Sequence, residues 1–380
     1  MTGVIVVKLG STLVTDGRGQ ARRSLLAARA AEIGALVRGG ARVCVVSSGA
    51  IALGLPRLGL ARRPRATPRL QAASAVGQAR LQQAWDTALR AEGLEAAQIL
   101  LSAADLAARP SYLNLRNAFE TLLKLGVVPV VNENDATATD EITFGDNDAL
   151  AAQVAVLLRA RLLVLLTEVD GVYTAHPATP GAELVSEGDM TRGLTLGHGS
   201  PLGRGGMASK IAAARLSAAA GIPTVIASGR GPTVLGPIVA GEQRGTRFAA
   251  VPANANAFKL WLRYAKPTAG RIVVDEGARS ALVANGRSLL AVGIVEAAGP
   301  FVPGDAVELV AVDGTVFGKG LASAASDELE GRPKGLEAVH RDRLVLYEAT
   351  GAGEGSGGRV IAPSDAEETS AAYLASTPDV

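Results

Sequence analysis

Short β-branched runs alternate with longer Ala- and Leu-rich segments through the first 250 residues, and this alternation restricts the fold more than any other feature. The runs are apolar on both sides, so each predicts a strand buried on both faces of a sheet. The longer segments have helical spacing. Together they predict a three-layer α/β sandwich with a mainly parallel sheet. The predicted strands are 4–7, 43–46, 127–131, 162–166 and 224–227, and the predicted helices are 25–37, 78–91, 113–125, 149–159 and 207–220.

The sequence changes character after residue 252. Pro252 and Pro267 bracket a stretch that predicts a connector, and the strand pattern that follows contains Asp313-Gly314, a signal for a two-residue hairpin turn. From Gly351 onward Gly, Ser, Glu and Ala dominate, which predicts disorder. We therefore expect a first domain at 1–252, a connector at 253–267, a small β-rich domain at 268–347 and a disordered tail at 348–380.

The composition of the chain argues against several kinds of site and partner. The chain has one cysteine, Cys44, and three histidines, so it has no internal disulfide and almost no material for a Cys/His zinc site. A net charge of +2 gives no reason to expect electrostatic binding of nucleic acid or of an anionic membrane. No apolar stretch reaches the ~18 residues of a membrane span, and the N-terminus lacks a signal peptide pattern. We expect a cytoplasmic protein with no membrane partner.

Two lysines stand beside glycine turns that could contact phosphate. Lys8 follows the first predicted strand next to Gly10, and Lys210 ends the glycine-rich stretch 203–210. Such turns let backbone N–H groups approach an anion, and lysine adds a point charge. An ordinary surface lysine is the more frequent meaning of so short a motif as the one at Lys8. The chain contains no Walker A sequence, so a kinase of this sequence would not be a P-loop enzyme.

Ser47-Ser48-Gly49 predicts a strand-to-helix turn whose N–H groups and hydroxyls could bind an anion. Simple capping of the helix by serine is an equally good interpretation. The turn is no Gly-x-Ser-x-Gly elbow, so a serine hydrolase is not expected.

Two clusters of amide and acid residues, 132–135 and 145–148, flank a short segment ahead of a predicted helix. Asn and Asp offer donors for a carboxylate and acceptors for an ammonium, which an amino acid presents together. Asp can also hold magnesium. A solvated turn with an Asp cap would give one such cluster, and the coincidence of two favours an amino acid site.

These strand-end motifs together resemble the amino acid kinase family, and within it the members that phosphorylate glutamate. The matching stretches are 6–11, 47–52, 130–135, 144–148 and 205–210, within a similar region of 4–347. The resemblance implies the amino acid kinase fold. It also implies ATP-dependent phosphorylation of the γ-carboxylate of L-glutamate to L-glutamyl 5-phosphate, the first step of proline biosynthesis, with ATP and Mg²⁺ as cofactors. The second domain, with Asp275 to Ala278 near its start, resembles a PUA domain, a module better known from RNA-modifying enzymes.

The same resemblance implies roles for particular residues, with no residue assigned to the metal. The catalytic set is Lys8, Lys210 and Asp148. The glutamate-binding set is Ser48, Asn134, Asp135 and Asn147. The ATP-binding set is Lys8, Gly10, Thr167, Glu168, Arg204, Gly205, Gly206, Met207, Ala208, Ser209 and Lys210. The resemblance further implies a homo-oligomer, a dimer or a tetramer, and feedback inhibition by proline.

Three positions depart from the family pattern, and all lie on the nucleotide side. Glu168 stands where the family usually has Asp, His176 replaces the Asp of Ala-Asp-Pro, and Arg204 replaces the Thr of Thr-Gly-Gly. Two alternatives to phosphorylation of glutamate stay open. One is a related enzyme that acts on N-acetylglutamate, aspartate or a nucleoside monophosphate. The other is an RNA-binding PUA protein with a vestigial kinase domain.

Overall fold

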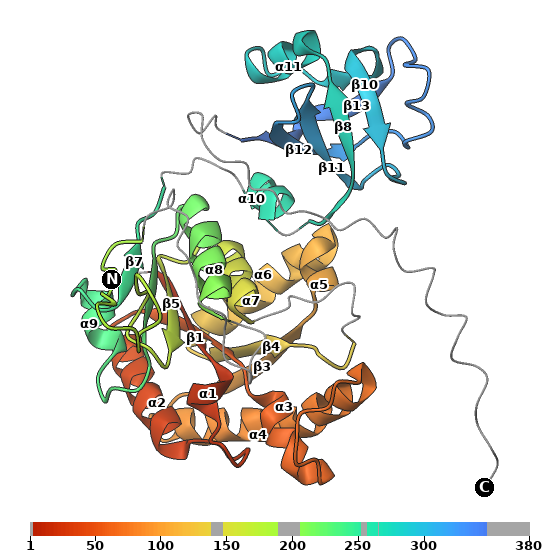
Figure 1. Ribbon diagram of the computed structural model, residues 1–380. Helices are drawn as coiled ribbons and strands as arrows, with labels where there is room; N and C mark the ends of the chain where they lie inside the picture. The colour runs from red at the N-terminus through yellow and green to blue at the C-terminus, as the bar shows by residue number, and fades with distance from the viewer. Residues whose placement is uncertain (1–2, 138–146, 189–205, 252–256, 265, 348–380) are drawn as a thin grey trace, which may run out of the picture.

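The computed structural model describes residues 3–137, 147–188, 206–251, 257–264 and 266–347, which form two folded units with one helix between them (Figure 1). The first unit contains a seven-stranded sheet in the order β3-β4-β2-β1-β5-β6-β7. All neighbouring strands are parallel except β6 and β7. The strands are β1 (Val4–Leu9), β2 (Arg42–Ser47), β3 (Ala96–Leu101), β4 (Val128–Glu133), β5 (Leu162–Thr167), β6 (Thr224–Ser228) and β7 (Thr246–Phe248).

All five predicted strands are confirmed, and each extends beyond its apolar run at one end or both. Lys8 and Thr167 consequently lie inside β1 and β5 rather than after them. The edge strands β3 and β7 were missed by the sequence pattern. β3 begins with two alanines and a glutamine, and β7 has only three residues, so neither makes a distinct β-branched run.

The sheet is covered on both faces, as the alternation predicts. Along β1, Val4 and Val6 belong to one buried cluster, whereas Ile5, Val7 and Leu9 belong to another. Helices α6, α7 and α8 pack on the first face, and α2 and α4 pack on the second (Figure 1). The helices are α1 (Ser11–Val14), α2 (Arg23–Arg38), α3 (Ala50–Gly54), η1 (Leu55–Leu58), α4 (Thr67–Arg90), α5 (Ala103–Ala107), α6 (Arg109–Lys124), α7 (Asn147–Leu158), α8 (Met207–Ala219) and α9 (Leu235–Ala240).

Helices α3 and α4 touch through their backbones. A Cβ atom added to Gly54 would lie 1.8 Å from the carbonyl oxygen of Ala73, and one added to Gly77 would lie 1.8 Å from that of Ala50. Only glycine fits at both positions, because the clash would be with backbone rather than with a movable side chain. This contact holds the middle of α4 against the helix that follows β2.

The predicted connector is not a plain linker. It contains helix α10 (Ala257–Tyr264), and both Trp261 and Leu262 of this helix are buried in the cluster on the first face of the sheet. Prolines at both ends of the stretch suggested a connector, whereas the apolar residues between them form a docked helix. The domain boundaries themselves stay a prediction.

The second unit is a six-stranded sheet in the order β10-β8-β11-β12-β13-β9, with its own buried cluster. Only β8 and β11 pair in parallel. Its elements are β8 (Thr268–Val274), α11 (Glu276–Val283), β9 (Leu289–Leu290), η2 (Ala291–Gly293), β10 (Ile294–Ala298), β11 (Ala306–Ala311), β12 (Val316–Ala322) and β13 (Glu337–Leu346).

The hairpin predicted at Asp313-Gly314 is confirmed, with one correction. Its loop has three residues rather than two, because Ala311 donates its N–H to the carbonyl of Thr315 and accepts the N–H of Gly314. Gly314 has a φ of 85°, which is the left-handed residue of a three-residue hairpin loop. The tail predicted at 348–380 lies outside the described residues. Among the helices that the structure describes, none is long and apolar enough to cross a membrane.

Candidate active site

A buried carboxylate holds two lysines together at the carboxyl edge of the large sheet. Asp148, in the first turn of α7, is fully buried. Its Oδ1 lies 2.5 Å from Lys8 Nζ, and its Oδ2 lies 2.9 Å from Lys210 Nζ. The two lysine side chains are themselves buried, with 3% and 9% of their surface exposed. In these two ion pairs of the described residues, two cations share one anion in a site shielded from water, and such an arrangement favours an anionic ligand.

Glycine keeps space open beside the Lys8 ammonium. Lys8 lies on the central strand β1, where it pairs with Val46 and Leu165 on the two neighbouring strands. Gly10 has a φ of −71°, so the backbone does not require glycine there. An added Cβ would stand 4.0 Å from Lys8 Nζ, in the space next to the ammonium. The absence of a side chain at Gly10 therefore leaves room for a ligand.

A chain of buried amides stands beside the lysines. Asn147, the residue before Asp148, donates from Nδ2 to Ser48 Oγ at 2.9 Å and to Asn132 Oδ1 at 2.7 Å. Asn132 in turn donates to Gln78 Oε1 on α4 at 2.9 Å. The turn after β2 needs Gly49, whose φ is 120°. The predicted pair Ser48 and Asn147 is thus in direct contact, with orientations set by β4 and α4.

The loop after β4 carries the other two predicted glutamate residues. Asp135 accepts a 2.6 Å hydrogen bond from Ser74 Oγ on α4, and Asn134 donates its backbone N–H to the carbonyl of Leu101 at the end of β3. Asn132 belongs to the predicted 132–135 cluster but received no role of its own, and sequence reasoning gave no site role to Ser74 or Gln78. Their signal was weak but present, because Ser74 and Gln78 are polar residues one turn apart on an Ala-rich stretch of α4.

The residues predicted to bind ATP lie in a more exposed region where the structure describes them. Glu168, after β5, pairs with Arg230, after β6, and their side chains are 36% and 61% exposed. Gly206 precedes α8, whose first turn holds Met207, Ala208 and Ser209, ahead of Lys210. Thr167 ends β5, and its carbonyl accepts the N–H of Gly229.

The predicted ATP-binding residues Arg204 and Gly205 lie outside the described residues. His176, which departs from the family pattern, is exposed, and its Nδ1 accepts the N–H of Ala178 within a turn. That hydrogen bond gives His176 a local role in the turn.

The described acidic residues do not form a protein cage for a metal ion. Within the described ranges, no group of three or more His, Cys, Asp or Glu side chains gathers to hold one. Asp148 has each carboxylate oxygen against a lysine ammonium. Mg²⁺ commonly binds through substrate phosphates and a few water molecules, and this arrangement suits that mode better than a resident site.

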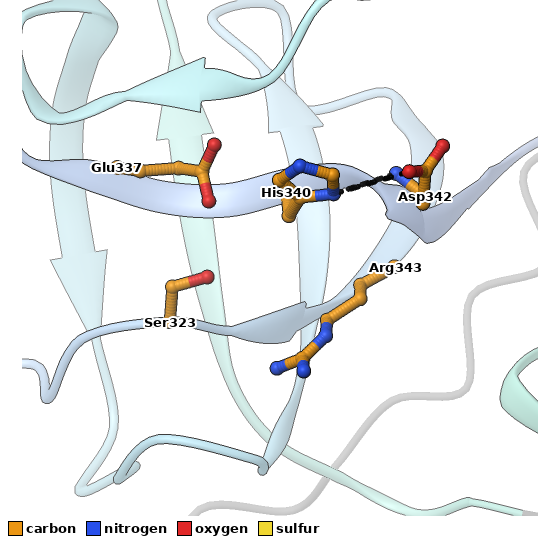
Figure 2. Close-up of a pocket in the computed structure, with 5 residues that line it drawn as sticks. All are labelled: Ser323, Glu337, His340, Asp342 and Arg343. Atoms are coloured by element: carbon orange, nitrogen blue, oxygen red, sulfur yellow. Dashed lines mark hydrogen bonds and ion pairs between the residues drawn. The ribbon is translucent and has the colours of Figure 1, made fainter.

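A hollow lies on the β12–β13 side of the smaller unit (Figure 2). It mixes acids with bases, and His340 Nδ1 accepts the N–H of Asp342 at 3.1 Å. Its lining residues are Ser323, Glu337, His340, Asp342 and Arg343. It has no lysine pair like that of the first unit, so the groups suited to phosphoryl transfer are those around Asp148.

Comparison with known proteins agrees with the geometry. Residues 3–228 match the amino acid kinase family, and residues 270–341 match the PUA domain. The chain is 44% identical to a glutamate 5-kinase of Burkholderia multivorans over 362 residues, which is 90% of this chain and 97% of that protein. It is 41% identical to a glutamate 5-kinase of Geobacter sulfurreducens over 364 residues, with the same two coverages. Among solved structures, the product complex of T. acidophilum isopentenyl phosphate kinase aligns with a TM-score of 0.48 and 20% identity, over 64% of this chain and 99% of that one.

Proposed function

Because the chain belongs to the amino acid kinase family, we propose that it transfers the γ-phosphoryl group of ATP to the γ-carboxylate of L-glutamate. The product is L-glutamyl 5-phosphate, and the reaction is the first step of proline biosynthesis. The observation that carries this proposal is Asp148, which holds Lys8 and Lys210 beside the Ser48, Asn132 and Asn147 network.

The reaction needs little covalent help from the protein. A γ-carboxylate is ionised at neutral pH and is itself the nucleophile, so no general base is required. One carboxylate oxygen forms a bond to the γ-phosphorus, the bond from that phosphorus to the bridging oxygen breaks, and ADP leaves with the electron pair. Positioning and charge stabilisation supply the catalysis. Lys8 and Lys210 are suited to stabilise the charge on the transferring group, and Asp148 holds both in place.

The two ends of the reaction would be bound by different parts of the sheet edge. Ser48, Asn134, Asp135 and Asn147 provide the donors and acceptors that an amino acid carboxylate and ammonium need. The start of α8 is suited to bind phosphate, because the backbone N–H groups in the first turn of a helix point out of its N-terminus. Mg²⁺ would enter with the ATP phosphates and neutralise part of their charge.

A hydroxylamine trap tests the proposal. The protein, ATP, Mg²⁺ and L-glutamate would be incubated with hydroxylamine, which converts an acyl phosphate into a hydroxamate that is detected as its coloured iron(III) complex. We expect signal with L-glutamate, and none with N-acetylglutamate or aspartate. ADP release with UMP, or salt-sensitive RNA binding without any ATP turnover, would instead favour the alternatives. Assembly as a dimer or tetramer, inhibition by proline, RNA binding by the second domain and a cytoplasmic location stay predictions.

A further inference from the structure

Arg109, the first residue of α6, is surrounded by aromatic rings. Its Cζ lies 5.6 Å from the ring centre of Tyr112, 5.5 Å from that of Phe258 and 5.4 Å from that of Trp261. Aromatic residues make up only 3% of the chain, so three rings around one guanidinium indicate a specific contact rather than general packing. Arg109 Nη1 is buried and makes no hydrogen bond, and burial lowers the pKa of Arg109. Cation–π contacts are therefore the main partners of this charge.

Trp261 links α10 to the loop that carries Asn134 and Asp135. Its buried Nε1–H donates to the carbonyl of Leu106 in α5 at 2.9 Å. Helix α5 starts directly after β3 at a capping box formed by Ser102 and Asp105. The carbonyl of Leu101, one residue earlier, accepts the N–H of Asn134. Leu101, Leu106 and Trp261 belong to one buried cluster, so the path from α10 to the glutamate side is continuous.

Helix α10 also packs against α7, which begins with Asn147 and Asp148. Helix α10 thus reaches both elements that carry glutamate-side residues. The exposed pair of Glu168 and Arg230 lies after β5 and β6, which take no part in these hydrogen bonds, although Leu165 of β5 and Ile226 of β6 pack in the same buried cluster.

The second unit lies on the side of α10 that is away from the first unit (Figure 1). Arg263 Cζ lies 4.6 Å from the ring centre of Tyr347, at the end of β13. Ala306, Leu321 and Val345 of the second unit join the buried cluster that contains Trp261. The ammonium of Lys319 on β12 donates to the carbonyl of Lys266, two residues beyond α10. Helix α10 is therefore packed between the two units rather than tethered between them.

We propose that α10 transmits the docking of the second domain to the glutamate side of the site, with Arg109 and Trp261 as its positioning residues. Neither residue touches the reacting groups. They act by fixing α5 and the end of β3, and through these the backbone of Asn134. This inference rests on the proposed function, because it assigns glutamate to that side.

Steady-state kinetics of three arginine or tryptophan variants tests the inference. Trp261→Phe removes the N–H donor and keeps a ring, and Arg109→Met removes the cation and keeps an apolar stem. We expect each to raise the glutamate KM about three- to tenfold and to change the ATP KM less than about twofold. Arg109→Lys should lie between Arg109→Met and the wild type, because lysine stacks less well on rings. The matched control is Lys124→Met, which removes an exposed cation at the other end of the same helix, and we expect wild-type constants for it.

Amide hydrogen exchange distinguishes a local loss of positioning from a general loss of folding. It also gives a result that does not depend on the proposed function. In Trp261→Phe, amides of residues 132–137 should exchange faster than in the wild type, with α2 and β2 unchanged. Unchanged glutamate KM in both Trp261→Phe and Arg109→Met overturns the inference. An equal rise in both KM values also overturns it. If the wild type makes no glutamyl hydroxamate, the proposed function fails. In that case the exchange rates of residues 132–137 still test whether α10 acts on this loop. Unchanged rates in Trp261→Phe would refute the inference.

Discussion

On the side of the site that we propose binds glutamate, called the glutamate side, polar side chains are buried and bonded to one another, whereas on the proposed nucleotide side the described ion pair is exposed. Asn147, Asn132 and Gln78 form a chain of hydrogen bonds with no more than 8% exposure. Glu168 and Arg230 face water. A buried polar group that loses its partner costs far more than an exposed one, since water cannot replace the lost bond. The glutamate side should therefore be sensitive to single substitutions, and the nucleotide side should be tolerant.

The lysines between the two sides should give the largest effect. We expect Lys8→Ala and Lys210→Ala each to lower kcat about 10²- to 10³-fold with a much smaller change in glutamate KM, because each lysine stabilises charge that develops in the transition state. Steady-state ADP release measures both constants. Lys124→Ala, an exposed lysine at the end of α6, is the control. Unchanged turnover in either site variant would remove that lysine from the mechanism.

Lys319 is also buried, but it differs from Lys8 and Lys210 because its hydrogen bond goes to a carbonyl rather than to a carboxylate. Burial lowers the pKa of Lys319 from 10.5 to about 8. The unfolded chain thus binds more protons between these pH values, so stability should rise with pH across that window and level off below about pH 8. Relative to Lys319→Met, we expect a gain of roughly 2 kcal/mol in the free energy of unfolding between pH 8 and 10.5. Denaturant unfolding at several pH values measures it, with the exposed Lys334→Met as control. Parallel curves for wild type and Lys319→Met would contradict the assignment.

Gln78 tests the buried network directly. Gln78→Leu leaves Asn132 without its acceptor, and we expect the glutamate KM to rise about tenfold, because Asn147 loses its fixed orientation. The ATP KM should stay within about twofold of the wild-type value. Gln83→Leu, an exposed glutamine on the same helix, is the matched control. A glutamate KM equal to that of the control would mean that α4 does not orient the site.

The exposed pair should give the smallest effect. We expect Arg230→Ala to change the ATP KM less than about threefold, and less still at high salt, because exposed ion pairs contribute little and are screened. Arg244→Ala, from the exposed pair with Glu242, provides the baseline. A tenfold change would break the comparison, since the nucleotide side would then be as organised as the glutamate side.

The sequence predicted the sheet and the edge that carries this site better than it predicted the hydrogen bonds within the site. The apolar runs of the sheet core were long enough to recognise, and the carboxyl ends of parallel strands meet at one edge. Lys8, Ser48 and Thr167 could therefore be placed together from their positions along the chain. The edge strands β3 and β7 and helix α10 were missed, because three to eight residues of mixed composition carry little periodicity.

The hydrophobic pattern of the sequence was enough to determine the alternation of strands and helices and the parallel sheet. It also indicated the sheet edge that carries the site and the separate β-rich domain. Only the tertiary structure decided which polar groups meet. Gln78 and Asn132 are 54 residues apart, and Asp148 and Lys210 are 62 apart. Trp261 reaches Leu106 across 155 residues. Periodicity reports which face of an element is buried, whereas a buried hydrogen bond needs two particular atoms within about 3 Å. That condition is met only when the packed elements fix both partners, as α4 does for Asn132 and α10 does for Leu106.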